Sequence, residues 1–275
     1  MYKPSDLHQH LDSLGAKPKK RLSQNFLVDG NIVRKIVQAA HVKPGDLVLE
    51  IGPGPGALTQ ALLEAGAHVI AVEKDPTLAS GLEKLKSPER QLEIFCDDIM
   101  TFPLREKLLP LNQKVKVISN LPYHLTTPIL KRLIEEADLF SSLTLMVQEE
   151  VARRFTAKPK TPEYGSLTLF LSFYTNPRYA FMVSRNCFFP KPKVDSAIVY
   201  LEFKTPPLSE NVDGFFKITR TAFQHRRKMM RGSLKELCSP ETVTASLTNL
   251  GLNPCARPED LSLDDFLRFF AEISK

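Results

Sequence analysis

The sequence predicts an α/β domain built on a parallel, doubly wound sheet, followed by a small all-α domain. Short apolar runs of strand type alternate with helically spaced segments from residue 47 to residue 147. The helical intervals disappear between 170 and 203, and two helical patterns follow a Pro-Pro step at 206–207. Strands that alternate with helices form right-handed βαβ units. We therefore expect a first domain over residues 1–205 and a second over 206–275.

The elements of the first domain can be predicted in chain order from apolar spacing and turn residues. Residues 1–30 predict an irregular basic arm, which is followed by a helix with apolar spacing through Ile32 and Ile36 and by a Pro-Gly turn at 44–45. The expected strands are 47–51, 68–72, 92–95, 115–119 and 143–147, and the expected helices are 57–65, 76–85 and 125–137.

The rest of the chain departs from this alternation. Residues 170–183 and 197–203 predict an antiparallel pair of strands that closes the sheet. Residues 214–237 and 262–273 have helical spacing and predict the small C-terminal domain.

Composition and charge narrow the class of protein. The chain has 275 residues, a net charge of +6 and four cysteines without CxxC pairing. No zinc site, disulfide framework, secretory signal or long apolar stretch is evident, so we expect a soluble cytoplasmic protein without metal or membrane contact. We expect a monomer, which would suit the binding of a bulky substrate. Clustered basic residues favour phosphate contacts: Lys17, Lys19, Lys20, Arg21, Arg153, Arg154, Lys158, Lys160, Arg220, Arg226, Arg227, Lys228 and Arg231.

A glycine-rich loop lies between the first strand and its helix. It has the sequence Gly52-Pro53-Gly54-Pro55-Gly56. Glycines at this position allow positive φ angles and let a ligand approach the main chain. The pattern also fits the dinucleotide fingerprint, so the loop alone predicts an adenosine-containing cofactor and does not choose between NAD and S-adenosylmethionine.

Acidic residues near the loop favour S-adenosylmethionine. Glu73 ends the second strand, where a carboxylate accepts hydrogen bonds from ribose hydroxyls with either cofactor. Glu50 precedes the loop, as in many methyltransferases with a similar pattern. Asp97 and Asp98 follow the third strand, where one side chain would accept a hydrogen bond from the adenine amine. We prefer Asp98, although the two adjacent acids leave the choice open.

The tetrapeptide Asn120-Leu121-Pro122-Tyr123 follows the fourth strand, at the end where doubly wound folds bind ligands. The exocyclic amine of an aromatic ring is a poor nucleophile because its lone pair is delocalised. The Asn120 side-chain oxygen and the Leu121 carbonyl would accept the two amine protons and draw the nitrogen towards tetrahedral geometry. Pro122 fixes the turn, and Tyr123 offers a ring on which an extruded base can stack. The pattern predicts methyl transfer to an exocyclic amine.

Phe188 precedes Phe189-Pro190-Lys191-Pro192 near the end of the predicted sheet. An aromatic side chain held between prolines is a candidate for the opposite wall of the base pocket.

Together these blocks resemble the ribosomal RNA adenine dimethyltransferase family, called KsgA/RsmA in bacteria. The resemblance runs from about Lys19 to Phe270. Its blocks occur in order: 24–27 (QNFL), 50–54 (EIGPG), 120–123 (NLPY), 192–196 (PKVDS) and 222–228 (AFQHRRK).

The resemblance implies a Rossmann-like methyltransferase fold and S-adenosylmethionine as cofactor. By matched position it implies a cofactor site of Asn25, Leu27, Gly52, Glu73, Asp98 and Asn120, with Tyr123 and Phe188 holding the flipped adenine. It implies that the substrate is two neighbouring adenosines near the 3′ end of small-subunit (16S) rRNA, each methylated twice, in a late assembly intermediate.

Three departures from the family pattern, Ser23, His225 and Gly232, concern RNA contacts more than chemistry. An Erm-type enzyme acting on large-subunit rRNA is the nearest alternative, and the 192–196 and 223–228 blocks favour the small-subunit branch. A DNA adenine methyltransferase would need a target-recognition domain. A dehydrogenase would have no use for the 120–123 tetrapeptide, and a non-catalytic assembly factor would not need the intact loop.

Overall fold

The computed structural model describes residues 4–19, 24–207, 210–225 and 228–274. Its contacts divide the chain into two compact units. The first, named the sheet unit here, comprises residues 1–152 and 178–203, and the second, the helical unit, comprises residues 153–177 and 204–275. This differs from the expected division at 205/206, because residues 153–177 pack with the C-terminal helices.

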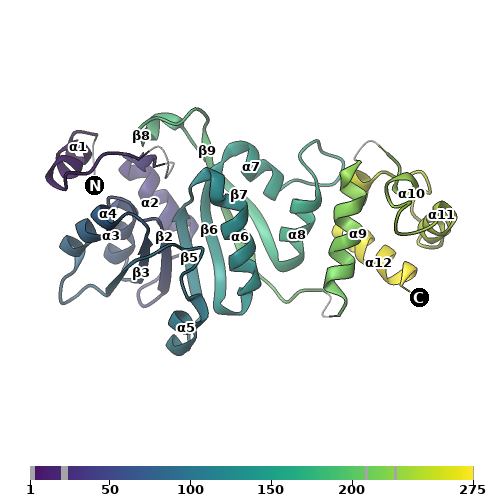
Figure 1. Ribbon diagram of the computed structural model, residues 1–275, viewed down its shortest axis with the longest axis horizontal. Helices are drawn as coiled ribbons and strands as arrows, with labels where there is room; N and C mark the ends of the chain where they lie inside the picture. Colours follow the sequence, from purple (N-terminus) through teal and green to yellow (C-terminus); the bar gives the residue numbers. More distant parts are fainter. Residues whose placement is uncertain (1–3, 20–23, 208–209, 226–227, 275) are drawn as a thin grey trace. The chain divides into compact units, whose positions relative to one another are not determined.

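A seven-stranded sheet is the centre of the sheet unit, in the order β4-β3-β2-β5-β6-β9-β7 (Figure 1). Strands β2 to β6 are mutually parallel. Strand β2 lies between β3 and β5, so the strand order reverses there, and ligands of such sheets bind at the carboxyl ends of the strands beside that point. The parallel strands are β2 (Leu47–Ile51), β3 (His68–Glu73), β4 (Leu92–Cys96), β5 (Val115–Asn120) and β6 (Phe140–Gln148).

The end of the sheet departs from the parallel pattern, as the loss of helical intervals predicted. Strand β9 (Ser196–Phe203) pairs antiparallel with β6, and β7 (Thr175–Val183) is the edge strand beyond it. The expected strand over 170–183 is nevertheless wrong in its first part, because Phe170–Tyr174 belong to helix α8 (Ser166–Tyr174). The run is apolar on nearly every position, so its periodicity did not distinguish a helix from a buried strand.

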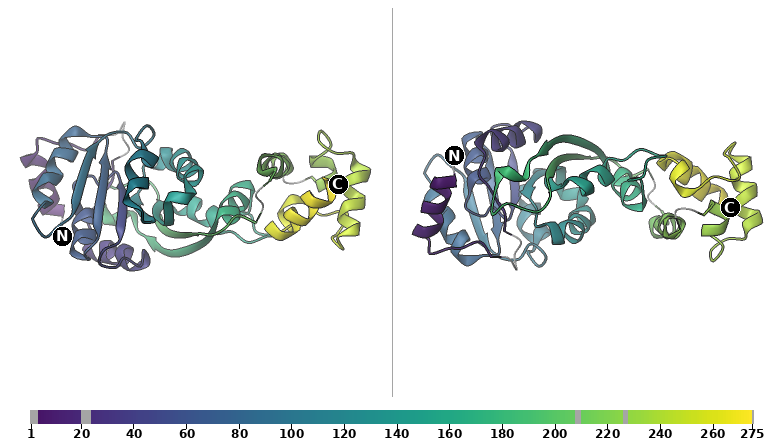
Figure 2. Two further views of the ribbon diagram at one scale, coloured as in Figure 1. Left: turned by 90° about the horizontal axis from the view of Figure 1, so that it is seen from below. Right: turned by 90° about the horizontal axis from the view of Figure 1, so that it is seen from above.

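Helices flank the sheet (Figure 2). Every residue of β2 is buried, as is usual for a parallel strand covered on both faces. The expected helix over 76–85 is α4 only as far as Gly81 and continues as a 3₁₀ turn over Leu82–Leu85. Besides the N-terminal helix described below, the helices of this unit are α2 (Gly30–Ala39), α3 (Ala57–Glu64), α4 (Pro76–Gly81), α5 (Leu104–Leu108), α6 (Thr126–Glu135) and α7 (Glu149–Phe155), which extends across the unit boundary.

A two-stranded sheet joins the N-terminal arm to the loop before β9. Strand β1 (Phe26–Leu27) pairs antiparallel with β8 (Phe188–Phe189), so that Leu27 lies opposite Phe188. This pairing brings together two segments that the sequence analysis assigned to different parts of the site.

The start of the chain is more ordered than predicted. Instead of an irregular arm, the structure has helix α1 (Pro4–Ser13). Leu7 and Leu11 lie one turn apart and pack in a buried cluster with Phe26 and Leu78. The expectation of an irregular segment was wrong because this short helix has few apolar residues and is stabilised by tertiary packing.

The helical unit has its own apolar core. Tyr164, Leu169 and Phe173 pack there with residues from the C-terminal helices such as Phe215 and Phe266. The expected helix over 214–237 is interrupted after Gln224. The unit contains α8, α9 (Val212–Gln224), α10 (Met230–Ser233), α11 (Pro240–Asn249) and α12 (Leu263–Ile273). Within the described part of the chain, no helix is both long and apolar enough to cross a membrane.

Candidate functional site

A cavity of about 290 Å³ lies at the carboxyl ends of the parallel strands in the sheet unit. It sits beside β2, where the strand order reverses, as the fold class predicts. The described residues that line it are 24–27, Ile36, 50–55, 57–58, 72–74, 97–100, 120–125, Ile129 and Met146. The cavity therefore unites the glycine loop, the four acidic residues Glu50, Glu73, Asp97 and Asp98, and the tetrapeptide.

The glycine loop adopts a backbone that other residues rarely take. Gly52, Gly54 and Gly56 have φ angles of 65°, 58° and 91°. A Cβ at Gly54 would lie 3.1 Å from the Phe26 ring. The loop therefore combines left-handed backbone with close approach of the N-terminal arm, and both features require glycine at residue 54.

Glu73 holds the loop in place. One carboxylate oxygen accepts a hydrogen bond from the Gly54 N–H at 2.9 Å, and the other accepts one from the Asp75 N–H at 2.8 Å. Burial raises the pKa of Glu73, while these hydrogen bonds favour its ionised form. Each carboxylate oxygen can accept a second hydrogen bond, so Glu73 can bind a ribose hydroxyl while it orders the loop.

Glu50 is the least satisfied side chain of the cavity wall. It is 1% exposed, and its Oε2 atom is buried with no hydrogen-bond partner. Burial raises its pKa to about 8; the Thr59 side chain opposes this effect and the nearby Glu73 carboxylate adds to it. The raised pKa favours the protonated form of Glu50 in the ligand-free chain, and a cationic ligand would favour its ionised form. S-adenosylmethionine carries a sulfonium and an ammonium group, so a buried acid on this cavity suits it. The residues present thus fit the cofactor that the sequence predicted.

Both candidate adenine acceptors line the cavity, and the structure shows how each is engaged. Asp98 forms an ion pair with Lys74 at 2.6 Å and accepts a hydrogen bond from the Met100 N–H at 3.0 Å. The Lys74 hydrogen bond is the main cause that lowers the pKa of Asp98. Asp97 accepts a hydrogen bond from the Asp98 N–H at 2.7 Å. The preference for Asp98 stays a prediction.

The tetrapeptide Asn120-Leu121-Pro122-Tyr123 lines the cavity and contacts the N-terminal arm. The Asn120 amide nitrogen donates a hydrogen bond to the Asn25 carbonyl at 3.1 Å. This bond uses the nitrogen and leaves the side-chain oxygen as the atom that accepts from an amine. Leu121 is buried, and its N–H donates to the Met146 carbonyl at 3.2 Å. The Tyr123 hydroxyl lies 2.7 Å from Ser196 Oγ, and burial raises the pKa of this tyrosine.

Of the other predicted cofactor- and base-binding residues, all but Phe188 line the cavity. Asn25, Leu27, Gly52 and Gly54 line the cavity. Phe188 is only 4% exposed, belongs to the apolar core, and is not among the described residues that line the cavity.

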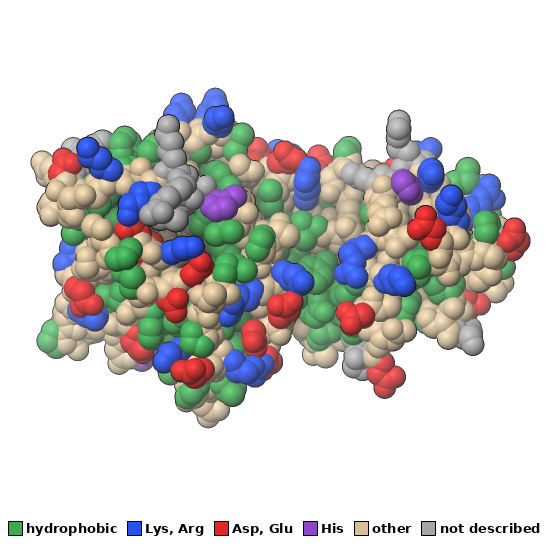
Figure 3. Space-filling model, in the orientation of Figure 1, with side chains coloured by type: hydrophobic (Ala, Val, Ile, Leu, Met, Phe, Trp, Pro, Cys, Tyr) green, Lys and Arg blue, Asp and Glu red, His purple; other side chains and the backbone are tan. Residues whose placement is uncertain are grey.

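The predicted RNA-binding residues include one in a partly buried ion pair, one exposed residue and four that the structure does not describe. Lys19 forms an ion pair with the buried Asp75 at 2.7 Å. Lys228 is exposed in the helical unit, while Lys20, Arg21, Arg226 and Arg227 lie outside the described residues. On the face shown in Figure 3, basic side chains are interspersed with acidic ones.

Two residues of this region were not among the predicted site residues, although Gln24 belongs to the 24–27 block. Gln24 lines the cavity, and Asp75 binds its side chain. Asp75 directly precedes Pro76 and caps α4, and this Asp-Pro helix start is a signal that could have marked it. Among the described residues, no cluster of three or more His, Cys, Asp or Glu side chains is placed to hold a metal ion.

Comparison with known proteins identifies the family and the relatives of this chain. The family model described as ribosomal RNA adenine dimethylase matches residues 15–275. Ribosomal RNA small subunit methyltransferase A of Protochlamydia amoebophila (strain UWE25) is 60% identical over 276 residues, covering 99% of this chain and 97% of the relative.

Two solved structures are similar over most of the chain. The crystal structure of a dimethyladenosine transferase from Plasmodium falciparum has a TM-score of 0.74 and 28% identity over 90% of this chain and 97% of that one. The structure of the 23S rRNA methyltransferase ErmE has a TM-score of 0.71 and 28% identity over 91% of this chain and 100% of that one.

Proposed function

We infer from its membership of the ribosomal RNA adenine dimethylase family that this chain is an S-adenosylmethionine-dependent rRNA adenine dimethyltransferase acting on the small subunit. The observation that carries the proposal is the cavity in which the glycine loop and Asn120-Leu121-Pro122-Tyr123 face the same space. One wall suits an adenosine-containing cation, and the other offers two acceptors for an exocyclic amine.

The cofactor is proposed to lie against the glycine loop and the arm. Gly52 and Gly54 let it approach the backbone, Glu73 accepts from the ribose, and Asp98 accepts from the adenine amine. Glu50, whose raised pKa favours its protonated form in the ligand-free chain, would ionise when the cationic groups of the cofactor bind nearby. When bound, the cofactor supplies an electrophilic methyl group on a sulfonium, which needs no metal or general base from the protein.

The tetrapeptide is proposed to hold the target base. The Asn120 side-chain oxygen and the Leu121 carbonyl accept the two protons of the adenine amine, which localises the nitrogen lone pair. Held in this way, the amine nitrogen would be oriented towards the methyl group that a bound cofactor would supply, and the methylated nitrogen would lose its extra proton to water. Orientation and polarity of these residues provide the catalysis.

Tyr123 is the proposed stacking surface for the flipped adenine. Its hydroxyl is tied to Ser196, which orients the ring. For Phe188 the same role stays a prediction, since this residue belongs to the pairing of β1 and β8 and its side chain is buried in the apolar core. A base that stacks on Phe188 would require this loop to move.

The RNA partner is proposed to be small-subunit rRNA in a late assembly intermediate, with two neighbouring adenosines near its 3′ end as targets. Exposed Lys228 is a proposed phosphate contact, and the same role for Lys20, Arg21, Arg226 and Arg227 stays a prediction. A monomeric state and a cytoplasmic location also stay predictions.

The nearest alternative is methylation of large-subunit rRNA. The fold does not separate the two substrates, because the 23S rRNA methyltransferase ErmE has a TM-score of 0.71. Sequence favours the small subunit, since the relative named for that subunit is 60% identical and ErmE is 28% identical.

The test is transfer of tritiated methyl groups from S-adenosylmethionine to undermethylated small ribosomal subunits, followed by nucleoside analysis. We expect dimethyladenosine, and its loss in Asn120→Ala. If only large-subunit RNA were labelled, the proposed substrate would be wrong and large-subunit rRNA would take its place. Cofactor binding without any transfer would favour a non-catalytic assembly factor.

A further inference from the structure

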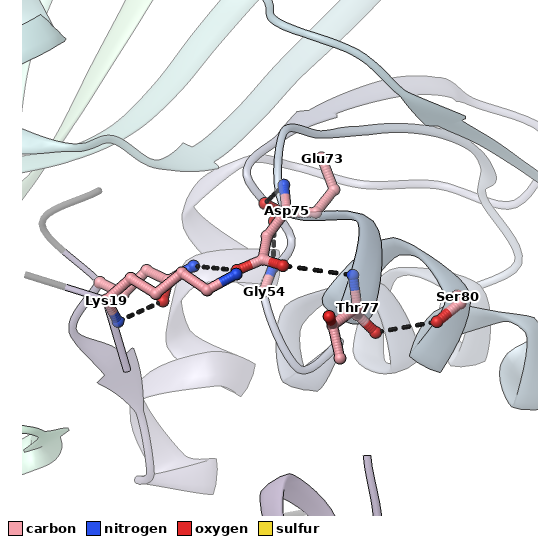
Figure 4. Close-up of polar contacts among 7 residues, drawn as sticks. Lys19, Gly54, Glu73, Asp75, Thr77 and Ser80 are labelled. Atoms are coloured by element: carbon pink, nitrogen blue, oxygen red, sulfur yellow. Dashed lines mark hydrogen bonds and ion pairs between the residues drawn. The ribbon is translucent and has the colours of Figure 1, made fainter. Parts of the chain in front are cut away.

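Asp75 connects the N-terminal arm to the sheet unit through its side chain (Figure 4). Its Oδ2 atom lies 2.7 Å from Lys19 Nζ and accepts a hydrogen bond from Gln24 Nε2 at 3.2 Å. Its Oδ1 atom accepts from the Thr77 N–H at 3.2 Å and caps α4. One carboxylate thus binds two arm residues and the start of a helix.

The backbone of Asp75 belongs to the cofactor site. Its N–H donates to Glu73, whose other oxygen binds the Gly54 N–H. Figure 4 shows this chain of contacts from Lys19 through Asp75 and Glu73 to Gly54. The arm and the glycine loop are therefore joined by consecutive polar contacts.

Residues 24–27 of the arm form part of the cavity wall. The Lys19 N–H donates to Gln24 Oε1 at 2.7 Å, so the two residues that bind Asp75 also bind each other. Gln24 begins the lining segment 24–27, and within it Asn25 accepts the hydrogen bond from Asn120. A shift of this segment would displace both the cofactor wall and the Asn120 amide.

Loss of the Lys19–Asp75 ion pair would leave a buried carboxylate without its cation. The Asp75 side chain is 3% exposed, and that of Lys19 is 36% exposed. A buried carboxylate without its cation is costly, so the local structure rearranges when the partner is removed. Burial opposes the charged form of Asp75, yet the hydrogen bonds from Lys19 and Gln24 hold its pKa below the ordinary value.

We propose that Asp75 and Lys19 are positioning residues, whose ion pair holds segment 24–27 against the cofactor cavity and thereby sets cofactor affinity. In this role Lys19 binds the protein and is not a phosphate contact, which revises the sequence-based expectation for it. The inference rests on the proposed function only in assigning the cavity to S-adenosylmethionine.

The experiment measures binding of S-adenosylhomocysteine by calorimetry to the full chain. The variants are Asp75→Asn, Lys19→Gln and the double variant. Asparagine also caps helices well, so Asp75→Asn retains the start of α4. Lys116→Gln is the matched control, because Lys116 forms a partly buried ion pair with Asp46 at 2.8 Å and does not line the cavity.

Each single variant is expected to raise the dissociation constant about tenfold, and the double variant no further, as for residues that act through one contact. Hydrogen exchange of amides 24–28 in the ligand-free chain should accelerate in the same three variants. Lys116→Gln should change neither measurement.

The proposal is overturned if both single variants bind S-adenosylhomocysteine like the wild type, or if their effects add fully. Weaker rRNA binding by Lys19→Gln with unchanged cofactor affinity would return Lys19 to the RNA interface. If the wild type bound the cofactor but transferred no methyl group, the proposed function would be refuted. The binding measurements on the variants could still be interpreted, because they do not depend on methyl transfer.

Discussion

The side-chain nitrogen of Asn120 donates a hydrogen bond, 3.1 Å long, to the backbone carbonyl of Asn25. The two residues are 95 positions apart in the chain. This contact sets which atom of Asn120 is presented to a substrate, because the nitrogen is already engaged. It also makes the N-terminal arm a part of the catalytic wall.

Asn120→Ala removes the proposed amine acceptor. We expect kcat/KM for methyl transfer to fall at least about 100-fold, as when one preorganised polar group is removed from an active site. Asn120 is half-buried, so the melting temperature should change little. Asn120→Asp is the matched variant, because it keeps an acceptor but cannot donate to Asn25. Partial activity in Asn120→Asp would separate the two roles, and full activity in Asn120→Ala would contradict the assignment.

Tyr123 allows its ring and its hydroxyl to be tested separately. Tyr123→Phe removes only the hydrogen bond to Ser196 and should cost a few-fold in kcat/KM, as expected for about 1 kcal/mol. Tyr123→Ala also removes the stacking surface and should cost about 10- to 100-fold. Steady-state kinetics on small subunits would measure both. Equal losses in the two variants would show that the hydroxyl, and not stacking, is what matters.

Gly54 and Gly52 form a matched pair for testing the loop. Both have positive φ, so alanine at either position should destabilise the chain by about 1–2 kcal/mol. Only at Gly54 would the new Cβ lie 3.1 Å from the Phe26 ring, while nothing lies within 4 Å at Gly52. Gly54→Ala should therefore lose more unfolding free energy in urea and should disturb β1. Equal losses would mean that Phe26 moves aside without cost.

Glu50 should make the ligand-free chain less stable as pH rises. Burial raises its pKa to about 8 in the folded state, whereas the unfolded value is near 4.5. Between these values the folded state binds more protons than the unfolded state, so unfolding free energy falls with increasing pH. Glu50→Gln removes this group, and its stability relative to the wild type should grow by more than about 1 kcal/mol from pH 5 to pH 8. Denaturant titrations across this range would measure the difference, and a flat profile would contradict the burial argument.

Lys228 is the described residue that best tests RNA binding. Lys228→Ala should weaken binding to small-subunit rRNA a few-fold and reduce the salt slope of log Kd by about 1. Binding of S-adenosylhomocysteine should stay unchanged, because Lys228 lies outside the cavity. Filter binding at several salt concentrations would show this. An unchanged salt slope would remove Lys228 from the interface.

Local sequence determined the parts of the site that depend on neighbouring residues. The loop at 52–56, Glu73 at the end of β3 and Asn120 at the end of β5 were all predicted. Residues 52–55 of the loop, Glu73 and Asn120 line one cavity. They were predictable because a parallel sheet brings the carboxyl ends of its strands to one edge, and strand runs and glycines are visible in sequence. The antiparallel end of the sheet followed from the loss of helical intervals.

Tertiary structure decided what depends on the path of the chain. The Lys19–Asp75 ion pair, the Asn25–Asn120 hydrogen bond and the pairing of Leu27 with Phe188 each join segments that no local pattern connects. Helix α8 was mistaken for a strand because its apolar run carries no periodicity, and packing with Phe215 in the helical unit selects the helix. Periodicity encodes which face of an element is buried. The partner that buries it, and the charge that meets a buried carboxylate such as Asp75, are set only when distant segments fold together.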